Sequence, residues 1–145
     1  MTDLSHRFTN DSVGRALDLV GERWSLLILR EAFFGVRRYG EFARNLSIPR
    51  PTLSARLKTL VDARVLDRVD PVPEYVLTQA GRDLFGAVVT LMQWGDEHLA
   101  GPDGPPIRLR HNDCGEIGGT FVACGHCGGE IATGNVTPEP GPGFR

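Results

Sequence analysis

The chain has 145 residues, of which 41% are hydrophobic, and a formal net charge of -2. This length and apolar content suit one ordinary domain with its own core and a small appendage. No apolar run reaches the roughly 18 residues of a membrane span, and the N-terminus lacks a basic-then-apolar signal sequence, so we expect a cytoplasmic protein. All three cysteines lie in one short stretch, which argues against a secreted disulfide framework.

Residues 12–34 are predicted to be helical, because their apolar residues recur at the spacing that lines one helix face. Asp11 or Ser12 can cap the start by accepting a hydrogen bond from a free backbone N–H. Gly21 is expected to divide the stretch into two helices. A second apolar face around Leu29 exceeds what a small domain covers from within and indicates a partner chain.

Further elements follow in a regular order: short helices at 39–46 and 51–63, strands at 65–69 and 75–77, and one long helix at 79–99. The prolines at 49 and 51 separate the two short helices, because a residue before proline is pushed out of helical geometry. Thr78 is expected to cap the long helix. This order predicts a winged helix-turn-helix, so the fold class is mainly α with a small β-wing.

The predicted domain organisation has three parts. Residues 1–100 form a winged helix-turn-helix domain for DNA binding and dimerisation, and the "GPDGPP" stretch at 101–106 is a linker. Residues 107–145 form a Cys/His tail that we expect to be zinc-ribbon-like, with short β-like pieces at 107–109 and 120–123.

Charge is distributed unevenly along the chain. Residues 37–68 hold eight basic and three acidic side chains (8 - 3 = +5), whereas residues 81–145 hold four basic and eight acidic ones (4 - 8 = -4). Positive charge on a helix-turn-helix unit favours double-stranded DNA, whose major groove, roughly 12 Å wide, admits one helix. The candidate DNA-binding residues are Arg37, Arg38, Arg50, Thr52, Ser54, Arg56, Lys58, Arg64 and Arg68.

Roles for these residues follow from their chemistry. The hydroxyls of Thr52 and Ser54 can contact bases or phosphates near the helix start, and Arg56 can make paired hydrogen bonds to guanine. Arg50 and the free N–H groups of the helix N-terminus can hold a phosphate. An alternative is a protein-interaction module without DNA binding, because winged-helix folds are reused in that way.

The motifs "VGERW", "RRYGEF", "LSARLKTL" and "EYVLT", spread over residues 12–95, resemble the HxlR family of bacterial transcriptional regulators, relatives of the MarR group. The resemblance implies a homodimer whose N-terminal and last helices form the interface. It also implies two recognition helices on a pseudo-palindromic operator. In many relatives the position of Ser12 is a cysteine, which some of them use as an oxidant or electrophile sensor. Serine cannot form a thiolate, so that mode of sensing is not expected here.

The tail contains two similar half-sites, "HNDCG" at 111–115 and "CGHCG" at 124–128. Each has two metal-ligand candidates separated by two residues and followed by glycine. His111, Cys114, Cys124 and Cys127 would together make a Cys3His set, which is typical of a closed structural Zn2+ site and argues against hydrolytic catalysis. Two alternatives remain open: a redox-active cysteine pair and ordinary free thiols.

We expect a regulator and not an enzyme, because no Ser/His/Asp arrangement, phosphate loop or pair of carboxylates emerges from the sequence. A variant of this hypothesis is a regulator that responds to thiol oxidation through the cysteine tail. Another responds to a small molecule in an aromatic pocket lined by Trp24, Phe33, Phe34, Phe85 and Trp94. The sequence leaves the operator, the direction of control and the effector open.

Overall fold

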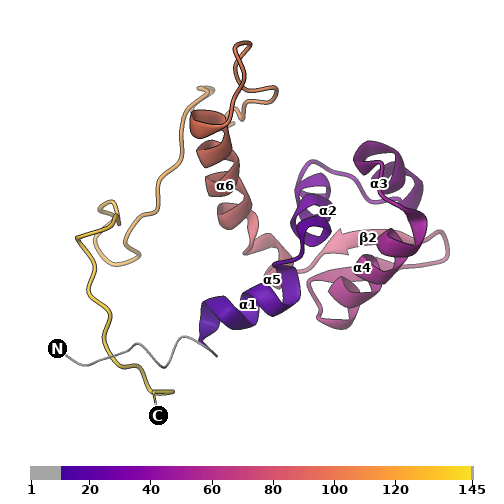
Figure 1. Cartoon of the computed structure of the whole chain (residues 1–145), viewed down its shortest axis with the longest axis horizontal. Coiled ribbons are helices and arrows are strands. Elements are labelled where there is room, and N and C mark those ends of the chain that lie inside the picture. The colour runs from indigo at the N-terminus through magenta and orange to yellow at the C-terminus, as the bar shows by residue number, and fades with distance from the viewer. Residues whose placement is uncertain (1–10, 145) are drawn as a thin grey trace. The chain divides into compact units, whose positions relative to one another are not determined.

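The computed structural model describes residues 11–144, and it begins with two helices, α1 (Ser12–Val20) and α2 (Arg23–Phe33) (Figure 1). The Asp11 carboxylate caps α1 by accepting a hydrogen bond of 2.8 Å from an amide in the first turn. Glu22 caps α2 in the same way. A Cβ at Gly21 would lie 2.4 Å from a carbonyl oxygen of α1, so only glycine fits between the helices. The predicted division is confirmed.

A helix-turn-helix follows, formed by α3 (Tyr39–Leu46) and α4 (Arg50–Asp62). Ser47 ends α3 in the left-handed conformation, with φ of 50°, and turns the chain sharply. Ile48 in the turn is buried and anchors the junction in the core. Pro51 lies in the first turn of α4, where a missing N–H costs no hydrogen bond.

Two antiparallel strands, β1 (Leu66–Val69) and β2 (Glu74–Leu77), form the wing. The amide of Tyr75 donates a hydrogen bond of 2.8 Å to the carbonyl of Arg37, so the hairpin is tied to the loop that precedes α3. This confirms the mainly helical fold with a small β-wing that the sequence predicts.

One core joins α1, α2, α3, α4 and β1. It is built from ten buried side chains: Val20, Ile28, Leu29, Phe42, Ile48, Leu53, Leu57, Leu60, Val65 and Leu66. Leu29 is fully buried in it. The expectation that the apolar face of α2 around Leu29 awaits a partner chain is therefore wrong, since α3 and α4 fold back over α2. The exposed large apolar side chains among described residues 11–36 are Val13 and Leu17 on α1 and Phe34 just after α2.

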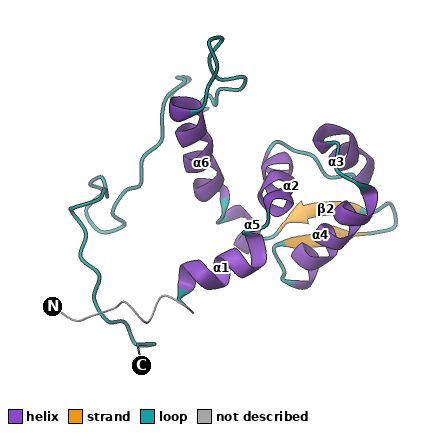
Figure 2. Cartoon of the chain, viewed as in Figure 1, coloured by secondary structure: helices purple, strands orange, loops and turns teal. Residues whose placement is uncertain are grey.

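The single long helix expected at 79–99 is also wrong: the chain forms a one-turn α5 (Gln79–Arg82) and then α6 (Phe85–His98) (Figure 2). The Thr78 hydroxyl caps α5 by accepting a hydrogen bond from Gly81, as predicted. Gly81 lies so close to the carbonyl of Val65 that a Cβ would come within 2.3 Å of its oxygen. This contact fixes α5 in place, and α5 ends after one turn, before α6 begins. No helix among the described residues is long and apolar enough to cross a membrane.

The described chain divides into two compact units, residues 11–86 and 87–144, so most of α6 groups with the tail. Between residues 99 and 144 the backbone is loop (Figure 2), with two isolated β-bridges, Arg110 to Ile117 and Ala123 to Glu130. The β-like pieces expected at 107–109 and 120–123 do not form strands in this described part, because these residues have no continuous partner strand.

Candidate nucleic-acid interface

Helix α4 has one buried and one free face. Leu53, Leu57 and Leu60 are at most 1% exposed and hold the helix against the core. Ser54 and Lys58 are exposed, one helical turn apart, on the other side. The free face therefore offers a short hydroxyl and a flexible cation, which suit contacts to base edges and phosphates in a major groove.

The start of α4 is held by Tyr39 of α3. The Tyr39 hydroxyl lies 3.0 Å from both the Arg50 carbonyl oxygen and the Ser54 Oγ. The Arg50 guanidinium carbon lies 5.5 Å from the centroid of the Tyr39 ring, within cation–π range. Pro49, the N-cap residue, makes no side-chain cap hydrogen bond to α4. Phosphate binding by the first-turn N–H groups stays a prediction.

Arg56 does not lie on the free face. Its Nε is 3.6 Å from the Glu22 carboxylate, which is longer than a hydrogen bond but within ion-pair range, and the side chain is only 36% exposed. Paired hydrogen bonds to guanine would require Arg56 to leave Glu22. Thr52 is half-buried as well. Of the residues predicted on α4, Arg50, Ser54 and Lys58 are the exposed ones. Lys58 Nζ lies 2.7 Å from the Asp62 carboxylate one turn further along the helix.

Three further basic side chains lie on the wing or in the loop before α3, and each of them pairs with a nearby carboxylate. Arg38 and Arg37 lie 3.2 and 3.8 Å from the Glu74 carboxylate of β2. Arg68 lies 3.5 Å from the Asp70 carboxylate in the wing turn. Exposed ion pairs of this kind contribute about 0–1 kcal/mol each, so a DNA phosphate can replace the acid at small cost.

An open groove of about 440 Å³ runs between α4 and the wing. Ser54 and Lys58 line one side, with Arg68 and Tyr75 across from them. Arg64, also predicted from the sequence, is exposed in the turn after α4, with φ of 59°. Sequence reasoning missed Tyr75, because its β-pattern indicated only a strand. It also missed Glu74, which lies outside the basic segment.

The tail contains two turns of the same design, which we call the first knuckle (residues 110–117) and the second knuckle (residues 123–130). Each is closed by an isolated β-bridge between its first and last residues. In the first, the His111 amide donates to the Glu116 carbonyl at 2.9 Å, and the Gly115 amide donates to the His111 carbonyl at 2.7 Å. His111 Nδ1 then lies 3.5 Å from Cys114 Sγ.

The second knuckle repeats these bonds. The Cys124 amide donates to the Gly129 carbonyl at 2.7 Å, and the Gly128 amide donates to the Cys124 carbonyl at 2.8 Å. Backbone N–H groups of Cys127 and His126 point at the Cys124 sulfur and lower the pKa of its thiol below the usual range. Such bonds favour the thiolate form.

Each knuckle brings its own pair of predicted ligands together, and all three cysteines are free. The two pairs are not gathered: within the described residues no cluster of three or more His, Cys, Asp or Glu side chains could hold a metal ion. The four-ligand site and its Zn2+ therefore remain a prediction.

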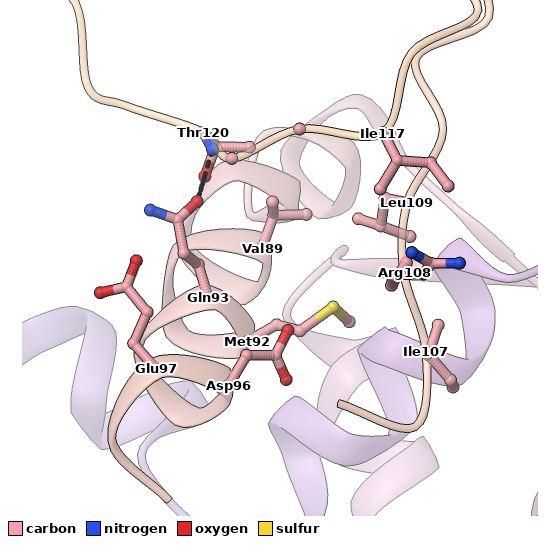
Figure 3. Close-up of a pocket in the computed structure, with 12 residues that line it drawn as sticks. Val89, Met92, Gln93, Asp96, Glu97, Ile107, Arg108, Leu109, Ile117 and Thr120 are labelled. Carbon is pink, nitrogen blue, oxygen red and sulfur yellow. Dashed lines mark hydrogen bonds between the residues drawn. The ribbon is translucent and has the colours of Figure 1, made fainter. Parts of the chain in front are cut away.

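The segment that links the knuckles is attached to α6. The amide and hydroxyl of Thr120 both donate to the Gln93 side-chain oxygen, the hydroxyl at 3.0 Å (Figure 3). A cavity of about 220 Å³ lies between α6 and the tail, lined by Val89, Met92, Leu109 and Ile117 among others (Figure 3). The knuckles are thus tethered to the last helix by a specific contact.

The aromatic side chains suggested for an effector pocket lie in different surroundings. Phe33 and Phe85 pack edge to face in the first unit, with ring centroids 5.1 Å apart. Trp94, in the second unit, packs on His98 at 5.0 Å. Trp24 packs partly buried against the core. The aromatic effector pocket stays a hypothesis.

A helix-turn-helix with a free polar face on its second helix, followed by a two-stranded wing, defines the winged helix-turn-helix class of DNA-binding proteins. The model of the HxlR-like helix-turn-helix family matches residues 19–102. The chain belongs to this family. The resemblance read from the sequence motifs is confirmed.

The similarity to other proteins extends beyond residues 19–102, which the family model matches. A protein of Mycobacterium tuberculosis strain H37Rv, named as an HTH-type transcriptional regulator, is 66% identical over 150 residues, covering 100% of this chain and 95% of that protein. The crystal structure of PA1607, described as a candidate transcription factor, has a TM-score of 0.80 at 36% identity over 93% of this chain and 98% of that chain. The redox regulator HypR in its reduced form has a TM-score of 0.54 at 28% identity, over 60% of this chain and 92% of that one.

Proposed function

We propose that the chain is a transcriptional regulator that binds a pseudo-palindromic operator as a homodimer. The observation that carries the proposal is the free face of α4, which presents Ser54 and Lys58 beside the groove that the wing closes. The names of the relatives support the same function.

Exposed apolar side chains support the dimer. Leu17 of α1 is 55% exposed, and Leu91 and Trp94 of α6 are 56% and 53% exposed. Large apolar side chains left in water, such as Leu91 and Trp94 three residues apart on α6, are typical of an interaction surface. Their positions agree with the family resemblance, in which the N-terminal and last helices form the interface. Two recognition helices would then lie about one duplex turn apart, roughly 34 Å.

Sedimentation tests the dimer. The wild-type chain should sediment as a dimer at micromolar concentration, and the Leu17→Glu/Trp94→Glu double variant should sediment as a monomer with unchanged helix content. A matched exposed position, Ala55→Glu on the free face of α4, should leave the dimer intact. A monomeric wild type would contradict the proposal.

Fluorescence anisotropy with DNA that flanks the chain's own gene tests the operator. Lys58→Ala should weaken binding and lower the slope of log affinity against log salt by about 1.8 for a dimer, since each phosphate contact contributes about 0.9. Ser54→Ala should lose discrimination between operator variants, by about 0.5–1.5 kcal/mol where the Ser54 hydroxyl makes a single hydrogen bond to a base. Arg108→Ala, which removes a cation in the tail, is the control. If Lys58→Ala binds as Arg108→Ala does, α4 is not the DNA-reading element.

A thiol-responsive regulator is a second candidate, favoured by the lowered pKa of Cys124 and the similarity to the redox regulator HypR. The test is operator affinity before and after hydrogen peroxide, reversed by a thiol reductant. An unchanged affinity, with the thiols oxidised by mass spectrometry, would refute it.

A further inference from the structure

The two knuckles share a backbone design that places ligand candidates at equal positions. The second and fifth residues of each eight-residue knuckle are His111 and Cys114, or Cys124 and Cys127. The glycine after each fifth residue adopts the left-handed conformation, with φ of 75° and 76°. This glycine turns backbone N–H groups inward. The two knuckles share their backbone hydrogen bonds, their closing β-bridge and their left-handed glycine. We infer that this repeated design serves a common purpose.

Ligand geometry is already present in the first knuckle. Zinc binds histidine nitrogen at about 2.0–2.1 Å and cysteine sulfur at about 2.3 Å, so at the tetrahedral angle two such ligand atoms lie about 3.5 Å apart. The observed separation of His111 Nδ1 and Cys114 Sγ is 3.5 Å. An ion can therefore bind between them without rearranging the turn.

The second knuckle supplies sulfur atoms that accept backbone hydrogen bonds. The His126 amide lies 3.4 Å from Cys124 Sγ, and the Gly129 amide lies 3.4 Å from Cys127 Sγ. Donors of this kind compensate the negative charge of a thiolate, which is the form that binds metal. His126 contributes its amide to this pattern, which accounts for its place between the two cysteines.

Asp113 completes the environment of His111. Its Oδ2 lies 3.5 Å from His111 Nε2, on the opposite side of the ring from Cys114. Metal-binding histidines usually donate the proton of the second ring nitrogen to a carboxylate, which fixes the tautomer. A proton on Nε2 leaves the lone pair of Nδ1 free for the metal.

We propose that His111 Nδ1, Cys114, Cys124 and Cys127 bind one Zn2+ ion, with Asp113 as the residue that orients His111. Each knuckle supplies two ligands, so closure of the tetrahedral set joins both knuckles on a single ion. The nine residues 115–123 between the ligand pairs include Gly118 and Gly119, where the backbone can reverse. Thr120, bonded to Gln93, then fastens the closed site to α6.

Elemental analysis of the purified full chain after zinc loading tests the ligand set. One zinc per chain is expected for the wild type and for His126→Ala, and none above background for Cys124→Ser. Circular dichroism checks that each variant is folded. Loss of zinc in His126→Ala, or retention in Cys124→Ser, would overturn the ligand assignment. A wild-type chain that holds no zinc, or an anaerobically purified chain with a cysteine disulfide, would overturn the metal site.

Cobalt tests the coordination and the role of Asp113. The cobalt-loaded wild type should show the intense absorption of a tetrahedral thiolate site, and Asp113→Asn should keep that spectrum while zinc affinity, measured by chelator competition, falls 10–100-fold. Asp103→Asn, in the loop before the first knuckle, is the matched control and should not change affinity. Unchanged affinity in Asp113→Asn would overturn the orienting role. None of these measurements depends on DNA binding.

Discussion

The carboxylate of Glu74 restrains the two arginines that precede α3, and its removal should strengthen DNA binding. Glu74 faces Arg38 at 3.2 Å and Arg37 at 3.8 Å, and the arginine side chains are 50% and 62% exposed. A phosphate that binds either arginine must displace Glu74 or share it. The variant Glu74→Gln keeps the shape of the side chain and removes this competition.

The magnitude follows from the value of exposed ion pairs. Such a pair contributes about 0.2–1 kcal/mol. Because the 3.8 Å contact is long, the Arg38 pair should dominate, at about 0.5–1 kcal/mol per protomer. A dimer releases two such pairs, so operator affinity should rise by about 1–2 kcal/mol, or roughly 5–30-fold. The hydrogen bond from the Tyr75 amide to the Arg37 carbonyl should keep the wing in place.

Fluorescence anisotropy over a range of salt concentrations measures this effect. Asp67→Asn is the matched control, because it also removes one negative charge from the wing, at an exposed position of β1. If both variants raise affinity equally, the effect is general charge and the specific release of Arg37 and Arg38 is refuted. A fall in affinity would mean that Glu74 holds Arg38 in its binding position.

Three further predictions concern stability, each measured by chemical denaturation. Gly81→Ala should destabilise the chain by about 1–3 kcal/mol, because the new Cβ would collide with the Val65 carbonyl oxygen. Gly86→Ala is the control: it has open space around it and should be neutral or slightly stabilising. Equal effects of the two substitutions would contradict the contact between Gly81 and Val65. Leu57→Ala should cost about 2–5 kcal/mol because the side chain is 1% exposed in the core, and a loss below about 1 kcal/mol would mean that the site is not packed as described. Thr78→Val removes the cap of α5 and should cost about 1 kcal/mol, and an unchanged midpoint would show that this cap is dispensable.

Local chemistry made much of the fold predictable from the sequence. The caps at Asp11 and Thr78 and the division at Gly21 follow from hydrogen-bonding capacity and backbone freedom within a few residues of each site. The helix-turn-helix and the wing follow from apolar spacing interrupted by proline. These features depend little on what the rest of the chain does.

Tertiary contacts decided the features that the sequence did not reveal. The break after α5 depends on Gly81 meeting Val65, and the burial of Leu29 depends on α3 and α4 folding over α2. Arg56 lies next to a buried stripe of α4, and only the position of Glu22 on another helix determines that the two pair. In the tail, residue spacing identified the metal-ligand candidates. The contacts of Asp113 with His111 and of Gln93 with Thr120 depend on the folded backbone and could not be read from spacing.

Tyr39 has a consequence for the entropy of recognition. Its hydroxyl, 3.0 Å from both the Arg50 carbonyl and the Ser54 hydroxyl, limits the rotation of Ser54 before any DNA is present. Immobilising a flexible side chain at an interface costs about 0.5–1.5 kcal/mol, and serine is at the lower end because it has a single rotatable bond. A free protein that already holds Ser54 in one rotamer has less of this cost left at the moment of binding. The free face of α4 is in this respect preorganised by a residue of the preceding helix.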